Sequence, residues 1–234
     1  MHQDLSYLVI DTETSGLFKF RDADGKPVPA DAPGQPRLAS VAFIYVDPGM
    51  SVISEREFLI RPDGWVLDGE AAAINGLTME RLMDEGIPVS DVLDLYTGAI
   101  NDSRVVVAFN AQFDTKMMRG ELRRAGRPDL FDQTKNICAM RACDGIVIKP
   151  DGGRGWPKLA HACAHFNIEQ QGQHTALGDA RACLEVFKHL VAIGAAPEPA
   201  VHLANASKSG VKPSVRRGTK TKTPAPQATD EIPT

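Results

Sequence analysis

The stretch LSYLVIDTETSGL, residues 5–17, decides the fold, because an apolar run stops there at two acidic residues. Residues 8–10 predict a buried strand, since they are apolar, partly β-branched and soon followed by the turn-forming residues 15–16. Residues two apart in an extended chain point the same way, so Asp11 and Glu13 should project together. Two such carboxylates raise each other's pKa unless a cation lies between them. Oxygen ligands favour Mg²⁺ or Mn²⁺, and the alternative is two solvated acids.

Composition predicts one folded body and a different tail. A chain of 234 residues with 43% hydrophobic residues can bury one good core. No apolar run is long enough to span a membrane, and the N-terminus lacks the features of a signal peptide. We therefore expect a cytoplasmic protein with no membrane contact. Pro, Ala, Ser, Thr and Lys dominate the end of the chain, which predicts a folded domain over 1–195 and a disordered basic tail over 196–234.

The four cysteines form no C-x-x-C pair, so free thiols are expected. One alternative is a zinc site that combines two of them with a His pair at helical spacing. That site would use Cys138, Cys143, His161 and His165.

The rest of the chain predicts alternating strands and helices. Residues 18–36 are rich in Asp, Pro, Gly and Lys and indicate a long loop or insertion beside the acidic pair. Further strands are expected over 37–46, 52–60, 104–109 and 131–137. Helices are expected over 67–75, 78–85, 89–100, 111–125, 138–145, 159–166 and 176–193.

Near the starts of two predicted helices lie polar residues that could share a site with the acidic pair. Asp114 falls in the first turn after strand 104–109, where an acid also simply stabilises the helix dipole. Parallel strands ending side by side would bring Asp114 near Asp11. Five residues are about 140° of helix rotation, so His174 and Asp179 can share a site only if His174 lies on the preceding loop. Four carboxylates and one His are what a two-metal phosphodiester hydrolase requires.

Three ordered motifs carry a family resemblance. D-T-E-T-x-G-L at 11–17, F-N-A-x-F-D at 109–114 and H-x4-D at 174–179 resemble those of the DEDD-type, His-containing, DnaQ-like 3′→5′ exonucleases. The resemblance covers about residues 5–193. It implies a ribonuclease-H-like α/β fold, a five-stranded mixed sheet flanked by helices. It also implies hydrolysis at the 3′ end of single-stranded or frayed DNA, with release of nucleoside 5′-monophosphates and a DNA polymerase or replication partner.

The resemblance further implies a role for each motif residue. Two Mg²⁺ or Mn²⁺ ions would be held, with Asp11 bridging both. Glu13 and Asp179 would bind one ion and Asp114 the other, and His174 would be the general base. Substrate contacts would fall on Thr12, Thr14, Gly16, Leu17, Asn110 and Phe113.

Two other functions stay open on sequence grounds. An exoribonuclease of the same fold, of the oligoribonuclease or tRNA-trimming kind, differs in how its pocket treats the 2′-hydroxyl, which these residues do not reveal. A non-catalytic module that binds a polymerase is the other alternative, although it would not need all five polar residues. The insertion and the basic loop 149–158 could also grip a strand, or they could be solvated loops. The candidate residues there are Lys19, Arg21, Lys26, Arg154, Lys158, Phe18, Phe20 and Trp156.

Overall fold

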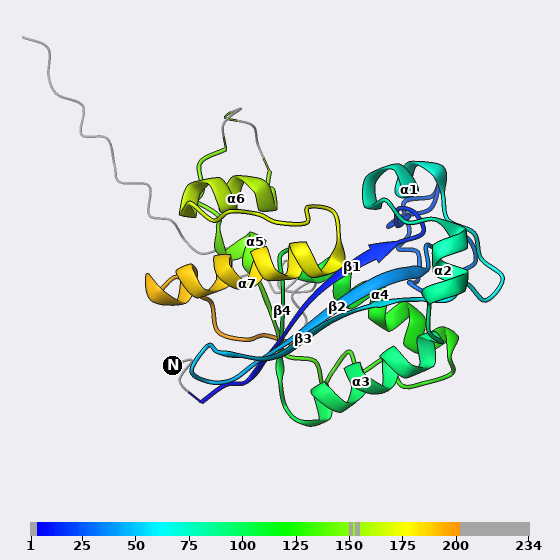
Figure 1. Cartoon of the computed structure of the whole chain (residues 1–234), viewed down its shortest axis with the longest axis horizontal. Helices are drawn as coiled ribbons and strands as arrows, with labels where there is room; N and C mark the ends of the chain where they lie inside the picture. Colours follow the sequence, from blue (N-terminus) through cyan, green and yellow to red (C-terminus); the bar gives the residue numbers. More distant parts are fainter. Residues whose placement is uncertain (1–3, 150–151, 153–154, 202–234) are drawn as a thin grey trace, which may run out of the picture. The chain divides into compact units, whose positions relative to one another are not determined.

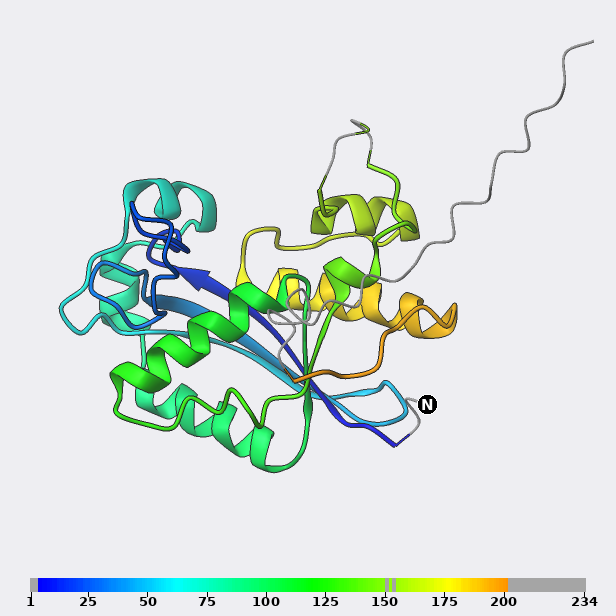
Figure 2. The ribbon, with the colours of Figure 1, turned by 180° about the vertical axis from the view of Figure 1, so that it is seen from behind.

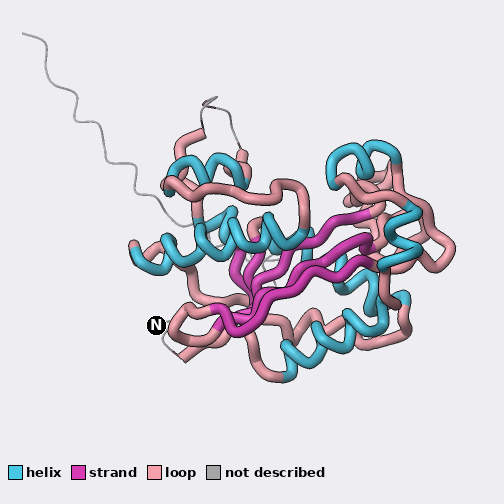
Figure 3. The backbone as a smooth tube through the Cα atoms, in the orientation of Figure 1, coloured by secondary structure: helices cyan, strands magenta, loops and turns pink. Residues whose placement is uncertain are grey.

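The computed structural model describes residues 4–149, 152 and 155–201. Its centre is a five-stranded mixed sheet, as predicted (Figures 1 and 3). The order of the strands in the sheet is β3-β2-β1-β4-β5. The central strand β1 is antiparallel to β2 and parallel to β4, while β3 is antiparallel to β2 and β5 is parallel to β4. The strands are β1 (Tyr7–Thr14), β2 (Leu38–Val46), β3 (Val52–Leu59), β4 (Val105–Ala108) and β5 (Asn136–Cys138).

Strand β1 is longer than predicted, because the acidic residues lie within it and not after it. Its first four residues are fully buried, so both faces of the strand are covered. Successive side chains alternate between two cores. Tyr7 and Val9 pack in the core that includes helix α7 (Ala176–Ala192), and Leu8 and Ile10 pack in the core of the opposite face.

The helices cover the two faces of the sheet in separate groups. Helices α3 (Val89–Asn101) and α4 (Ala111–Arg124) lie on one face. Helix α7 crosses the other face, joined by α5 (Ala139–Ala142) and α6 (Leu159–Phe166) (Figures 1 and 2). The arrow of β1 points toward α1 and α2, which follow β3 in the chain (Figure 1).

Helices α1 (Gly69–Asn75) and α2 (Met79–Glu85) have well-defined ends. The Asp68 carboxylate accepts the Glu70 N–H at 2.8 Å, and Thr78 caps α2 in the same way. Such caps satisfy backbone donors that the first helical turn leaves unpaired. Together the two short helices form a wall beyond the carboxyl end of β1.

The predicted strand 131–137 is wrong over most of its length, because only β5 is extended there. The Asp129 side chain accepts the backbone N–H of Phe131 at 3.1 Å, and the Leu130 carbonyl accepts that of Thr134 at 3.0 Å. Side chain to backbone bonds of this kind compete with a sheet ladder. The predicted helix 138–145 also shortens to α5.

The insertion 18–36 is anchored to the body. The Gln35 side chain accepts the Lys19 N–H at 3.0 Å and donates to the Lys19 carbonyl at 2.8 Å, which closes the loop on itself. Arg124 donates to the Ala30 carbonyl at 2.9 Å and so fixes the loop to α4. The insertion therefore has a definite position relative to the sheet.

At its end, the described chain continues past the boundary predicted at residue 195. Ala200 and Asn136 exchange two backbone hydrogen bonds of 3.0 Å, so the segment after α7 returns to β5. Residues 202–234, most of the predicted tail, lie outside the described residues. Among the described helices, none has the length and apolar character needed to cross a membrane.

Candidate active site

The alternation of β1 divides its last residues between two neighbours. Asp11 and Glu13 continue the series of Tyr7 and Val9, so they face the α7 side of the sheet. Thr12 falls on the opposite side, toward α4. Asp11 and Glu13 therefore lie on the same side of the strand, as the alternation of side chains predicted.

Asp179 completes a three-carboxylate cluster with these two residues. It lies in the first turn of α7, whose N-cap Thr175 accepts the Gly178 N–H at 3.1 Å. One carboxylate oxygen each from Asp11, Glu13 and Asp179 lies within 4.8 Å of the others, and all three residues are partly buried. This spacing is short enough for one cation to contact all three.

Asp114 reaches the same region from α4. It is 3% exposed, and the Thr12 hydroxyl donates to its carboxylate at 2.8 Å. Because Thr12 is flanked by Asp11 and Glu13, this hydrogen bond ties Asp114 directly to the acidic strand. The structure therefore brings all four predicted carboxylates to the carboxyl end of β1, with Asp114 outside the closest trio.

In the described part of the chain, no Lys or Arg forms an ion pair with the carboxylates of this region. Burial and then Asp114 and Asp179 raise the pKa of Asp11 well above its usual value. Burial, followed by Asp179 and Asp114, raises the pKa of Glu13 to about 8. Burial raises the pKa of Asp114 to about 7, although the hydrogen bonds from Thr12 oppose the shift. Like charges held together in a partly dry site favour the uptake of a proton or a cation.

His174 lies on the loop before α7, as the rotation argument required, and has a positive φ of 62°. It is exposed, and its imidazole is not part of the closest carboxylate trio. Burial raises the pKa of Asp179, and this shift is opposed by the hydrogen bond from Gln170, then by the charge of His174 and by a backbone hydrogen bond from His174. His174 is therefore a neighbour of Asp179 at the edge of the site.

Gly178 permits this loop to pack on α7. A Cβ atom at residue 178 would lie 2.0 Å from the Gly172 carbonyl oxygen and 2.6 Å from that of Gln171. Only a residue without a side chain allows such an approach. The loop that carries His174 depends on this contact.

A cavity of about 380 Å³ adjoins the carboxylates. Glu13 and Phe113 line it from β1 and α4, and α1 closes the opposite side with Ala71, Ile74 and Asn75. Most predicted substrate residues are found here, namely Thr12, Thr14, Gly16, Leu17 and Phe113.

These residues differ in exposure. Leu17 is 81% exposed at the rim of the cavity, whereas Thr12 and Thr14 are buried. The Thr14 hydroxyl donates to the Gly16 carbonyl at 2.6 Å, so it shapes the turn after β1. Asn110 is exposed at the start of α4 and does not line the cavity. Substrate contact by these residues stays a prediction.

Comparisons with known proteins agree with this geometry. A family model described as Exonuclease matches residues 8–187, which include every carboxylate of the site. The chain belongs to this exonuclease family. The matched range also contains the three motifs at residues 11–17, 109–114 and 174–179.

Individual members of the exonuclease family show how far the similarity extends. DNA polymerase III subunit epsilon of Treponema pallidum is 24% identical over 192 residues, which are 82% of this chain and 79% of that protein. An epsilon-like protein of Rhodobacter capsulatus is 26% identical over 188 residues, 80% of this chain and 24% of the relative. Escherichia coli exonuclease I in complex with a dT13 oligonucleotide superposes with a TM-score of 0.62 at 21% identity. That alignment covers 80% of this chain and 41% of exonuclease I, and it shows the fold.

Two contributors to the exonuclease site were absent from the sequence-based prediction. Glu57 of β3 pairs with Ala42, which pairs with Asp11, so Glu57 lies on the same face two strands away and raises the pKa of Asp11 and Glu13. The Gln170 amide donates to Asp179 at 2.7 Å. Neither belongs to a motif, and only strand register could have pointed to Glu57.

The zinc alternative is not supported in the described part of the chain. All four cysteines are free and buried. Within the described ranges, the one group of three or more metal-ligating side chains is Asp11, Glu13 and Asp179.

Proposed function

We propose that the protein is a divalent-metal-dependent 3′→5′ exonuclease that removes nucleoside 5′-monophosphates from single-stranded or frayed DNA ends. The observation that carries the proposal is the trio Asp11, Glu13 and Asp179, with ligand oxygens within 4.8 Å of one another. It stands in a chain that belongs to an exonuclease family. A cavity of about 380 Å³, lined in part by Glu13, adjoins the trio and would hold the terminal nucleotide.

The carboxylates fit two Mg²⁺ or Mn²⁺ ions. Their donors are all oxygen atoms, which these hard cations prefer. Asp11, Glu13 and Asp179 would hold one ion, and Asp11 with Asp114 would hold the second. The raised pKa of Glu13 and Asp114 marks charge that bound cations would relieve. When bound, such ions lower the pKa of water and stabilise charge on the phosphate oxygens.

The side chains of the protein orient the metal ligands and remove a proton from the attacking water. Thr12 holds the Asp114 carboxylate through its hydroxyl, and Gln170 holds Asp179, so the oxygen donors are oriented before substrate arrives. His174, on its exposed loop next to Asp179, accepts the proton of the attacking water. Leu17 and Phe113 contact the terminal base from two sides of the cavity.

The test is degradation of a 5′-labelled single-stranded oligonucleotide by the purified full chain with Mg²⁺ or Mn²⁺. We expect a ladder that shortens from the 3′ end, is abolished by EDTA, and is absent for Asp179→Asn. His174→Ala should lower kcat and remove the ionisation of the base from the pH profile. A substrate that stays intact with both metals contradicts the proposal.

The choice between DNA and RNA needs matched substrates. Oligonucleotides of one sequence in deoxy and ribo form isolate the effect of the 2′-hydroxyl. A higher kcat/KM for the ribo form would contradict the proposed preference for DNA and would support an exoribonuclease that uses the same site residues.

We also propose a DNA polymerase as a partner, supported by the similarity to the Treponema pallidum epsilon subunit. Co-purification of the tagged full chain with the polymerase of its own cell tests this. Recovery of the chain without any polymerase subunit would contradict it.

A further inference from the structure

The start of the insertion forms an aromatic surface against α4. The rings of Phe18 and Phe113 meet edge to face with centroids 5.3 Å apart. The Phe20 ring lies 5.9 Å from that of Phe18. Because Phe113 lines the cavity beside the carboxylates, these rings lead away from the candidate active site in an unbroken series.

Lys116 of α4 lies over both rings of the insertion. Its ammonium nitrogen is 4.6 Å from the Phe18 centroid and 4.4 Å from that of Phe20. Its one other polar contact is a 3.5 Å hydrogen bond to the Val28 carbonyl, and in the described chain no carboxylate pairs with it. Partial burial and then the charge of Arg119 lower its pKa. We call Phe18, Phe20 and Lys116 the aromatic ledge.

The aromatic ledge offers an aromatic ring for stacking with a base and an ammonium group for contact with a phosphate. Phe18 is 8% exposed and serves as a support, whereas Phe20 is 49% exposed and offers a ring surface to a base. Lys116 keeps donors that no acid occupies. The other cations of the insertion are less available, since Arg21 donates to the Gly25 carbonyl at 2.6 Å and Lys26 lies 3.7 Å from Asp24.

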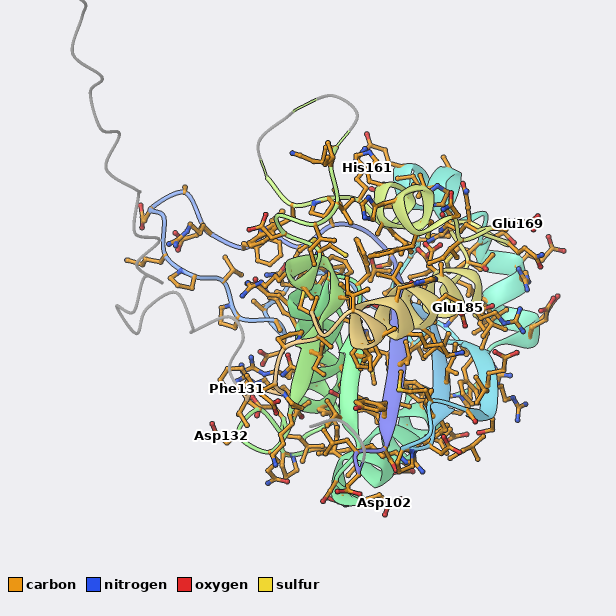
Figure 4. The ribbon with its side chains drawn as sticks, turned by 90° about the vertical axis from the view of Figure 1, so that its left-hand side faces the viewer. Asp102, Phe131, Asp132, His161, Glu169 and Glu185 are labelled. Atoms are coloured by element: carbon orange, nitrogen blue, oxygen red, sulfur yellow. The ribbon has the colours of Figure 1, made fainter. Side chains whose placement is uncertain are left out.

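Beyond the ledge, basic residues continue along α4. Lys116, Arg119 and Arg123 line a cavity of about 300 Å³ together with residues 27–30 of the insertion. Arg119 and Arg123 both pair with Asp129, whereas Lys116 has no acidic partner in the described chain. The Arg119 guanidinium stacks 3.7 Å from the Phe131 centroid, and its Nε is buried with no hydrogen-bond partner in the described structure. Lys116 and Arg123 are seven positions apart, which corresponds to about 10 Å of helix. Figure 4 labels Phe131 on the side of the molecule from which the insertion projects.

We propose that the aromatic ledge is a binding subsite for the unpaired nucleotides that precede the 3′-terminal one. This inference rests on the proposed exonuclease function and extends it. A base stacks on Phe20, its phosphate meets the Lys116 ammonium, and the strand continues toward Arg119. Stacking on an aromatic side chain tolerates any base, so the subsite accepts single strands regardless of sequence.

The experiment compares substrates that do and do not reach the ledge. The p-nitrophenyl ester of thymidine 5′-monophosphate fills only the terminal position, whereas a long single-stranded oligonucleotide extends over Phe20 and Lys116. The readout is the ratio of kcat/KM for the oligonucleotide to that for the ester, measured with Mn²⁺ on the full chain. Deoxy and ribo oligonucleotides form two arms, since both offer unpaired bases and phosphates.

Phe20→Ala and Lys116→Gln should each lower this ratio by about tenfold, through KM for the oligonucleotide. The wild-type ratio should rise with oligonucleotide length beyond a dinucleotide, and both variants should flatten that rise. Lys188→Gln is the matched charge control. Lys188 pairs with Glu185 on α7, and Figure 4 labels Glu185 away from Phe131. Ile193→Ala, at a residue 57% exposed, is the apolar control.

Three results are informative. Lower ratios for the ledge variants and unchanged ratios for the controls support the subsite. Unchanged ratios for both ledge variants, with ester hydrolysis present, overturn the subsite and leave the exonuclease proposal standing. Failure of the wild type to hydrolyse both ester and oligonucleotides overturns the exonuclease proposal itself.

Discussion

Glu121 and the acidic cluster at the end of β1 differ in how the protein balances their charge. Glu121 of α4 is 1% exposed and accepts hydrogen bonds from Arg37 at 2.9 Å, from Arg124 at 3.0 Å and from the Leu38 N–H at 3.1 Å. Asp11 and Glu13 lie beside two further carboxylates, and no Lys or Arg pairs with either in the described structure. One site is neutralised by the protein, and the other is not.

The difference teaches how to tell a structural acid from a functional one. Glu121 of α4 accepts hydrogen bonds from Arg37 and from the backbone of Leu38 at the start of β2, and α4 also holds the insertion. Its charge is therefore balanced by contacts that stabilise the fold. The acidic cluster at the end of β1 costs folding free energy, because buried like charges repel. Such a cost at the mouth of a cavity is typical of a functional site, and it supports the proposed binding of cations there.

Replacing an acid of the cluster should give the largest effect on activity and a small one on stability. Asp11→Asn is expected to lower kcat by about a thousandfold or more, since this residue would contact both ions. The metal-free variant should melt at or above the temperature of the wild type, because a buried charge repelled by its neighbours has gone. Exonuclease assays and thermal unfolding in EDTA measure both. Strong destabilisation would show that the cluster has a structural purpose.

Replacing the neutralised acid should do the reverse. Glu121→Ala leaves Arg37 and Arg124 without their shared partner, and we expect a loss of about 3 kcal/mol in urea unfolding. Activity per folded molecule should stay within a few-fold of the wild type. The control is Glu85→Ala, which breaks the exposed Arg81–Glu85 pair and should cost less than about 0.5 kcal/mol. Equal losses for the two variants would remove the contrast between buried and surface pairs.

A single methyl group should disturb the active-site loop. Gly178→Ala puts a Cβ 2.0 Å from the Gly172 carbonyl, so the loop that carries His174 must move. We expect kcat to fall by about a hundredfold, the effect of misplacing a reacting group by about 1 Å. Gly98→Ala is the control, since no atom lies within 4 Å of that Cβ in α3. An active Gly178→Ala enzyme would show that this contact does not position His174.

The pH dependence of stability should be a smaller effect. The pKa of Glu13 is raised from 4.5 to about 8, so the folded state holds its proton over a range in which the unfolded state has lost it. Metal-free stability should therefore fall as the pH rises from about 4.5 to about 8 and stay level above. Excess Mg²⁺ should raise the melting temperature more at the upper end of this pH range, because the ion no longer competes there with protons for the carboxylates. Glu13→Gln should show a shallower decline, and an identical profile would contradict this assignment.

Sequence reasoning succeeded where a local period governs the outcome. The period of two in a strand put Asp11 and Glu13 on one side, and the helical period put His174 on a loop before Asp179. It was wrong over residues 131–135, where the Asp129 side chain captures a backbone N–H and turns the chain. Strand propensity alone does not predict whether a single hydrogen bond between a side chain and the backbone is favoured over a longer edge strand.

The sequence by itself determined the acidic motif and its place along the chain, because these follow from the spacing of residues along one strand or helix. The five-stranded α/β fold was predicted from the resemblance of the three motifs to a known family. The tertiary structure decided which acids stay without a countercharge. Nothing in the sequence distinguishes Glu121, held by Arg37 from another element, from Glu57, which strand register places on the face of Asp11 two strands away. Partners far apart in the chain meet only through packing, and it is their charge and distance that separate a structural acid from one that can bind a cation.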